Sequence, residues 1–268
     1  MPDAWGAKRK GDFTTTARKR PVRKKPVFLA GESALVSEFG ALCAAAGRPA
    51  LYKLNSGERP LSRGPGLRQA AIPPRGALLA VELTNTDREA KRKNLRALDR
   101  ALPREALLLS SSTTVTVTEQ AGWIRHAGRL VGISALPTLL SGRLIELAPS
   151  PATTREAVSA ARDIFSALGK EVSVVQDRIG MVMPRILCML VNEAAFALME
   201  ETASPASIDA AMTLGTGYPL GPVEWAGKMG IGQVVSVLRA LRDDLGEERY
   251  RIAPLLQQMV TAGVSPAT

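Results

Sequence analysis

A run of hydroxyl-bearing residues, 110–114, directly follows the short apolar segment 106–109. Where a strand ends, such side chains either form a turn or bind a ligand at the edge of a sheet, and both interpretations stay open here. The chain has one histidine, His126, the residue type that most readily supplies a general base near neutral pH. His126 precedes the apolar segment 129–133 and stands outside any predicted element, so we expect it in a loop or at the surface.

The cysteines and the hydropathy pattern indicate a compartment. Cys43 and Cys188 lie in apolar segments with helical periodicity, which predicts buried free thiols and no disulfide. No apolar run reaches the roughly 18–20 residues that a membrane span needs. The N-terminus is polar and basic and lacks the apolar core of a secretory signal. We therefore expect a cytoplasmic protein with no membrane span.

The formal net charge of +10 is concentrated at one end of the chain. Residues 1–26 hold nine basic and two acidic residues, so they carry +7 of the total. This segment has few apolar residues and no helical periodicity, which predicts a disordered basic tail. A solvated tail is the simpler interpretation, and attraction to nucleic acid, anionic lipid or an acidic partner is the alternative. A transit peptide fits poorly, because acidic residues are present and no amphipathic pattern is clear.

Residues 27–149 alternate between short apolar segments and helical patterns, which predicts an α/β domain with a mainly parallel sheet. Residues 54–76 are rich in Gly and Pro and are predicted to be a loop. The predicted strands are 27–29, 49–53, 77–83, 106–109, 129–133 and 143–147, with helices at 35–46 and 87–102.

The pattern changes after Pro149, and residues 150–268 are predicted to form an all-α domain. The predicted helices are 153–168, 180–204, 207–214, 223–229, 233–245 and 253–262, with one short strand at 171–175.

The helical half carries two specific motifs. Asn192-Glu193-Ala194 is followed by Ser204 to Asp209 and then by residues 214–222, Leu-Gly-Thr-Gly-Tyr-Pro-Leu-Gly-Pro. This spacing of an N-E-A helix and a G-x-G-Y-P-x-G-P turn resembles the C-terminal domain of the NAD-dependent 3-hydroxyacyl-CoA dehydrogenase family. Residues 109–118 and 25–52 are similar to two further stretches of that family. The resemblance implies a Rossmann-like NAD-binding domain followed by a helical dimerisation domain, with an acyl-CoA substrate held between them.

The resemblance also implies which residues occupy the catalytic positions. Ser134 stands where the family has its general-base histidine, and Glu146, twelve residues later, matches the glutamate that orients it. Pro184 replaces a supporting asparagine, and Thr113 replaces a serine that contacts substrate. A serine without a partner base is a weak acid–base catalyst, and proline has no side-chain amide. Glu146 is a weak base unless burial raises its pKa, so a structural role, paired with Arg143 or another cation, is the simpler interpretation.

The positions that hold NAD in the family are also altered. Gly31 keeps the first glycine of the dinucleotide turn, but Ser33 and Val36 replace the other two, and Val36 is expected to push the helix off the sheet. Glu32 adds a negative charge beside the anion site at a helix N-terminus. The remaining family NAD positions are Lys53, where the family has a ribose-binding aspartate, and Lys91 and Ser111, which match a lysine and a nicotinamide-contacting asparagine.

Lys53 could instead meet a 2′-phosphate, as in NADP binding, although the altered glycine turn opposes this. Lys91 is retained from the family, but a surface lysine on a charged helix is the simpler interpretation. In the family a second glutamate lies near that lysine, and here the position is Thr86. NAD is thus the cofactor by resemblance, with binding in doubt.

Three functions remain open. The first is a non-catalytic homologue that forms a homodimer or heterodimer through the helical domain and acts as a structural or regulatory subunit. The second is an active NAD-dependent oxidoreductase on 3-hydroxyacyl-CoA in fatty-acid metabolism that uses Glu146, Ser134 and Thr113 in altered roles. The third is a sensor that binds acyl-CoA or a nucleotide, for which a pocket of a few hundred Å³ at the domain junction would be needed.

Overall fold

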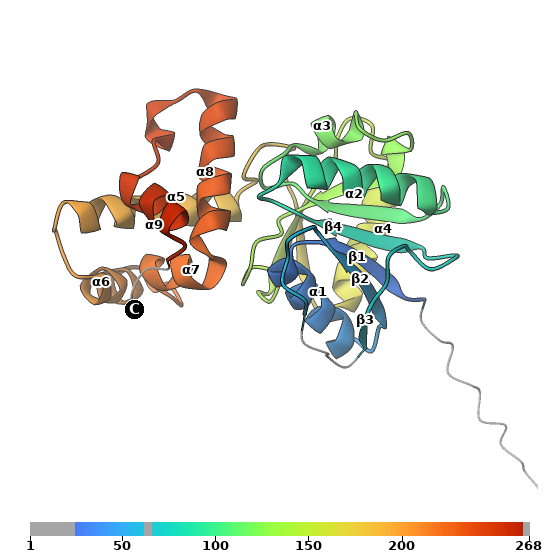
Figure 1. Cartoon of the computed structure of the whole chain (residues 1–268), viewed down its shortest axis with the longest axis horizontal. Helices are drawn as coiled ribbons and strands as arrows, with labels where there is room; N and C mark the ends of the chain where they lie inside the picture. Colours follow the sequence, from blue (N-terminus) through green and yellow to red (C-terminus); the bar gives the residue numbers. More distant parts are fainter. Residues whose placement is uncertain (1–24, 62–65, 265–268) are drawn as a thin grey trace, which may run out of the picture.

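The structure, a computed structural model, describes residues 25–61 and 66–264. Its larger part contains a sheet (Figure 1). The eight described strands of this sheet lie in the order β3-β2-β1-β4-β5-β6-β7-β8. All neighbouring strands run parallel except β6 and β7. The strands are β1 Val27–Gly31, β2 Ala50–Leu54, β3 Leu67–Gln69, β4 Leu79–Leu83, β5 Leu107–Ser111, β6 Leu130–Ile133, β7 Leu144–Ala148 and β8 Glu171–Val174.

Helices cover both faces of the sheet. Helices α1 (Ser33–Ala45) and α4 (Arg155–Ala167) pack on one face, and α2 (Arg88–Ala101) and α3 (Val117–Ala121) pack on the other. Successive side chains of a strand point to opposite faces, so Val27 and Leu29 join the core with α1 and α4, while Phe28 and Ala30 join the core with α2. Because both faces are buried, the central strands are almost wholly apolar.

The smaller part is helical and lies beside one end of the sheet (Figure 1). It consists of α5 (Met183–Met199), α6 (Pro205–Thr216), α7 (Pro222–Met229), α8 (Ile231–Leu245) and α9 (Pro254–Ala262). A third core joins α5, α7, α8 and α9, whereas α6 contributes no buried residue. Among the described residues, no helix has the length and apolar character of a membrane span.

The predicted fold class is confirmed, with two local corrections. The predicted boundary near residue 149 is wrong, because α4 packs on the sheet through Phe165 and β8 pairs with β7. Residues 54–76 are not all loop, since β3 pairs with β2. The predicted disordered tail, 1–26, lies almost wholly outside the described residues. Cys43 and Cys188 are free and buried as predicted, and burial raises the pKa of Cys43 to about 12.

Candidate functional site

The order of the strands marks one place at the edge of the sheet. The chain leaves β1 towards β2 on one side and later returns to place β4 on its other side. In open parallel sheets, ligands bind at such a switch point, outside the carboxyl ends of the strands. Gly31 ends β1 here with a φ of +147°, and a Cβ at this position would lie 2.3 Å from the carbonyl oxygen of Leu83. Gly31 therefore allows the close approach of β1 and β4 at the switch point.

The carboxylate of Glu32 occupies this switch point. Glu32 is 4% exposed. Its Oε1 accepts hydrogen bonds from the backbone N–H groups of Asn85 and Thr86, at 2.8 and 2.7 Å, and from the Thr86 hydroxyl. Its Oε2 accepts a hydrogen bond from Nε2 of Gln233, which belongs to α8 of the helical part. An internal anion thus binds the free amides that follow β4 and links the two parts of the molecule.

Asn85 extends this network to the ends of β5 and β6. Its Nδ2 donates to the carbonyl oxygen of Ala135 and to Oε1 of Gln233, at 2.8 and 2.9 Å. Its Oδ1 accepts hydrogen bonds from the hydroxyls of Ser111 and Thr113. Both hydroxyl residues are fully buried. The two hydroxyl positions singled out from the sequence are therefore brought together, and they bond to Asn85.

The N-terminus of α1 meets a second internal carboxylate. The backbone N–H of Ser33 donates to Oε2 of Glu58 at 2.9 Å. The prediction that Val36 pushes the helix away is wrong, because Val36 is fully buried in the core between α1 and the sheet. Lys53 is exposed at the end of β2 and lines an open pocket of about 560 Å³ together with Glu58.

Lys91 is buried, so its interpretation as a surface residue is wrong. It is 1% exposed and forms an ion pair with Glu82, which is fully buried in β4. Its Nζ also donates to the Ser110 hydroxyl at 3.2 Å and to the carbonyl oxygen of Ser111 at 2.8 Å. The pairing explains how a charged side chain is accommodated under the sheet edge, since a buried charge requires a partner.

Ser134 and Glu146 lie side by side, but the Ser134 hydroxyl and the Glu146 carboxylate do not hydrogen-bond to each other. The Ser134 hydroxyl accepts a hydrogen bond from the backbone N–H of Glu146 at 3.0 Å. The buried Glu146 carboxylate accepts from the N–H groups of Val182 and Met183, at 3.0 and 2.9 Å. These amides begin α5, so Glu146 satisfies two donors that a helix leaves free. The predicted pairing with Arg143 is wrong, because Arg143 forms its ion pair with Glu171.

Pro184 lies in the first turn of α5, where the missing N–H costs no helical hydrogen bond. It is buried, and it contributes no hydrogen-bond donor at the position where the family has an asparagine. Helix α5 thus begins at Met183 with a proline in its first turn, and its first free amides are capped by Glu146.

The sequence motifs of the helical part, which include Asp209 and Gly221, also have a structural basis. The Asp209 carboxylate accepts hydrogen bonds from the N–H groups of Val223 and Glu224, at 2.8 and 3.0 Å, in the first turn of α7. A Cβ on Gly221 would lie 2.1 Å from Oδ1 of Asp209, so this position requires glycine. The motif therefore fixes the angle between α6 and α7.

His126 lies at the opposite edge of the sheet from Ser134 and Glu146, immediately before the 3₁₀ turn η1 (Ala127–Arg129). Its side chain is 34% exposed, and its Nδ1 lies 3.1 Å from Oδ1 of Asp99. The expected loop position is confirmed, and His126 is not part of the network at the switch point.

The sequence did not single out Asn85, Glu58 or Gln233. Two of them, Asn85 and Gln233, stand out as polar residues in or beside apolar patterns. Asn85 follows an apolar strand almost directly, and Gln233 is a polar residue on the otherwise apolar buried face of α8. Beside Asn85 an open pocket of about 330 Å³ lies between Thr86 and Thr114 on one side and Ser236 and Arg239 of α8 on the other.

Comparison with known proteins identifies the family. The model of the 3-hydroxyacyl-CoA dehydrogenase NAD-binding domain matches residues 69–178, and the model of the family's C-terminal domain matches residues 180–267. The first match begins after Gly31 and β2, so the altered dinucleotide turn lies outside it.

Individual relatives are named as 3-hydroxybutyryl-CoA dehydrogenases. A 3-hydroxybutyryl-CoA dehydrogenase of Bradyrhizobium diazoefficiens is 32% identical over 69% of this chain, and a probable 3-hydroxybutyryl-CoA dehydrogenase of Bacillus subtilis is 30% identical over 69%. The chain spans 63% and 64% of the lengths of these two relatives. The crystal structure of (S)-3-hydroxybutyryl-CoA dehydrogenase from Ralstonia eutropha has the same fold, with a TM-score of 0.70, 23% identity, and coverage of 90% of this chain and 94% of that one. With adjoining family models matching from residue 69 to residue 267, the chain belongs to the 3-hydroxyacyl-CoA dehydrogenase family.

Proposed function

We propose that this chain is a non-catalytic member of its family that acts as a structural or regulatory subunit in the cytoplasm. The observation that carries the proposal is the position of the Glu32 carboxylate. It accepts four hydrogen bonds at the switch point, including two from backbone amides. A dinucleotide phosphate would have to displace this internal anion and would be repelled by it.

The residues at the cofactor positions do not fit NAD. The first free amide of α1 donates to Glu58, and the Ser33 side chain stands where the fingerprint of the fold has a glycine. Lys53 offers a cation where an acidic residue would hold the ribose hydroxyls. We therefore derive no hydride transfer through a nicotinamide in this chain.

The residues at the catalytic positions likewise form hydrogen bonds with other groups of the protein. Both oxygens of Glu146 accept hydrogen bonds from the start of α5, and the Ser134 hydroxyl accepts one from the backbone. Thr113 donates to Asn85, as does Ser111 at a cofactor position. These side chains hold the two parts of the molecule in place and leave no imidazole at the base position to take a proton from a substrate hydroxyl.

The test is oxidation of NADH with acetoacetyl-CoA at micromolar protein, followed by absorbance. A family member that retains the histidine serves as the positive control. We expect no turnover above the rate without protein. Turnover that disappears in Glu146→Gln, in a variant whose circular dichroism matches the parent, would contradict the proposal and support the active oxidoreductase.

We further propose that the helical part associates with a second copy of this chain or with an active relative. Helix α6 buries none of its residues in the single chain, and Leu214 in its last turn is 88% exposed. Ile186 and Met199 of α5 are also exposed, at 47% and 45%. Apolar surface of this kind is typical of an interface between proteins.

Light scattering after size-exclusion chromatography tests this association. We expect a dimer that Leu214→Glu weakens, while the control Val174→Glu, on β8 in the sheet part, leaves the dimer intact. A monomer at micromolar concentration, both alone and mixed with an active relative, would contradict the association.

The pocket of about 330 Å³ beside Asn85 favours one alternative, a sensor that binds acyl-CoA or a nucleotide. Its lining includes Arg88, which pairs with Glu119, and the acidic residues Asp243 and Asp244. Titration with acetyl-CoA by calorimetry separates the alternatives. Saturable binding without turnover would favour the sensor.

A further inference from the structure

The helical part is joined to the sheet part at two polar contact points. The first lies where the chain enters α5. There Glu146 of β7 accepts hydrogen bonds from the N–H groups of Val182 and Met183, and the N–H of Gly180 donates to the carbonyl oxygen of Thr113 at 2.9 Å. The second lies at α8, which Figure 1 shows on the side of the helical part that faces the sheet. Because the first point coincides with the chain connection, by itself it would allow the helical part to pivot.

Gln233, in the first turn of α8, makes the second contact. Its Nε2 donates to the carboxylate of Glu32, and its Oε1 accepts a hydrogen bond from Nδ2 of Asn85 at 2.9 Å. All three side chains are buried. Both ends of the amide are used, and a reversed amide would turn its oxygen towards a carboxylate, so these bonds form in one arrangement of the two parts. The bond to the carboxylate is charge-assisted and is therefore stronger than a bond between neutral groups.

Few apolar side chains cross the junction. Among the described residues, the buried core of the helical part includes Leu136 from the segment after β6 and Ile179 from the segment that leads into α5. Met181, in the same leading segment, joins the core under α2. Two of these three residues thus belong to the chain connection itself. The polar contact at Gln233 therefore carries much of what holds α8 to the sheet.

We propose that Gln233 acts as a latch, whose hydrogen bonds to Glu32 and Asn85 hold the helical part closed on the carboxyl edge of the sheet without a ligand. The pocket of about 330 Å³ lies beside these bonds. One of its walls is formed by the loops after β4 and β5, and the other by Ser236 and Arg239, which follow Gln233 along α8. The latch thus sets the distance between the two walls. It acts whether or not the chain turns over a substrate.

An exchange of the two bonded groups tests the latch. Gln233→Glu keeps the size of the side chain but places a second carboxylate beside Glu32, and two like charges disfavour each other, so the helical part should open. In the double variant Glu32→Gln/Gln233→Glu the amide and the carboxylate change places. The hydrogen bond between them can form again, and the closed arrangement should return. Gln258→Glu, at an exposed position of α9, is the matched control.

Distances between spin labels, measured by pulsed electron paramagnetic resonance, report the arrangement. The labels are attached at Lys93→Cys on α2 and Thr261→Cys on α9, which are both exposed positions. The native thiols of Cys43 and Cys188 are buried and should stay unlabelled. The labelled chain is diluted with an excess of unlabelled chain, so that distances within one chain are measured even if the chain dimerises. No nucleotide or acyl-CoA is added, so the result is independent of the proposed function.

The parent chain and Gln258→Glu are expected to give the same narrow distance distribution. Gln233→Glu should give a broader distribution that is shifted to longer distances, and the double variant should return to the parent's distribution. A distribution for Gln233→Glu equal to that of the parent would overturn the latch. So would a double variant that stays as broad as the single variant, because the opening would then follow from any change at position 233 and not from the loss of its bond to Glu32.

Discussion

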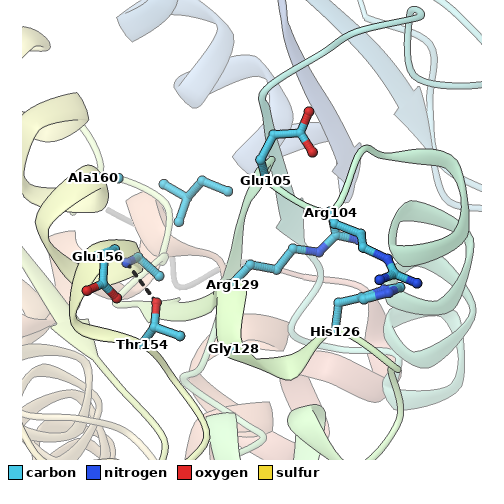
Figure 2. A pocket seen from close by; sticks show the side chains of 10 residues that line it. Arg104, Glu105, His126, Gly128, Arg129, Thr154, Glu156 and Ala160 are labelled. Atoms are coloured by element: carbon cyan, nitrogen blue, oxygen red, sulfur yellow. Dashed lines mark hydrogen bonds between the residues drawn. The ribbon is translucent and has the colours of Figure 1, made fainter.

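The two edges of the sheet use polar residues in opposite ways. At the carboxyl edge, Glu32 and Asn85 bond to the backbone, to the hydroxyls of Ser111 and Thr113, and to Gln233 of α8. At the amino edge, Asp99 binds Arg129 and His126 in a similar buried cluster. Arg104 and Glu156 line a pocket of about 500 Å³ in front of that cluster (Figure 2). Both are exposed, and neither forms an ion pair with another residue that the structure describes.

The difference shows how a protein's own carboxylates can satisfy the free amides at the edge of a sheet. An anion site at a helix N-terminus or a strand end still needs a negative charge, because its amides remain free. In this chain Glu32 and Glu58 supply that charge from within. The carboxyl edge is therefore held by the protein's own groups, whereas Arg104 and Glu156 at the amino edge are exposed to solvent.

The largest effect on stability is expected for the buried ion pair between Lys91 and Glu82, near the carboxyl edge of the sheet. Lys91→Met leaves Glu82 buried without its cation, so we expect the free energy of unfolding to fall by about 3–5 kcal/mol. Urea denaturation measures this loss. The double variant Lys91→Met/Glu82→Gln should regain part of it, and the control Lys93→Met, at an exposed position of the same helix, should be near neutral. A loss below about 1 kcal/mol would mean that this edge does not depend on internal pairing.

The stability contributed by the cluster of Asp99, Arg129 and His126 at the amino edge should depend on pH. Burial raises the pKa of Asp99, but the hydrogen bonds from Arg129, from the Arg125 N–H and from His126 outweigh it, and the pKa is lowered overall. A lowered pKa stabilises the fold above the ordinary value of about 3.9, and this stability is lost as the pH falls through the folded value. Asp99→Asn should therefore cost about 3 kcal/mol at pH 7, where it leaves Arg129 unpaired.

The difference in the free energy of unfolding between Asp99→Asn and the parent chain should shrink as the pH falls below about 3.9. Denaturation curves at pH 7 and at pH 3.5 measure the two differences. If the free energy of unfolding differs by the same amount at both pH values, the negative charge of Asp99 does not stabilise the fold.

The smallest effect is expected for the switch point. Glu32→Gln removes the charge but keeps one oxygen acceptor, so we expect a loss of about 1–3 kcal/mol in the free energy of unfolding. Amide hydrogen exchange should rise at Asn85 and Thr86, whose N–H groups donate to Glu32. Glu193→Gln, at an exposed position of α5, is the matched control. Unchanged exchange at both amides would contradict the role of Glu32 as their internal anion.

The fold could largely be predicted from the sequence, because hydropathy periods reflect what each element buries. The strands of the sheet were predicted near their observed positions, apart from β3, whose short exposed segment gives no hydropathy signal. The boundary was misplaced because α4 and β8 resemble the start of a helical part, and only their packing on the sheet assigns them.

The candidate site could be predicted only in part. The motifs single out Gly31 and Ser33, which lie at the turn after β1, Ser134, which follows β6, and Glu146, which lies within β7; the roles assigned to them stay predictions. The partners were not predictable, since Glu32 and Gln233 are 201 residues apart and meet only in three dimensions. The burial of Lys91 was missed for another reason: its helix is highly charged, which favours a surface position, and only the structure pairs it with Glu82 in an otherwise apolar strand.

Titration of the wild-type chain with NADH by isothermal calorimetry tests the central claim most directly. If Glu32 and Glu58 occupy the anion positions, no saturable heat will appear at concentrations that saturate a family member with an intact glycine turn. Saturable one-site binding in that range would contradict the account and would mean that NADH displaces the internal carboxylates.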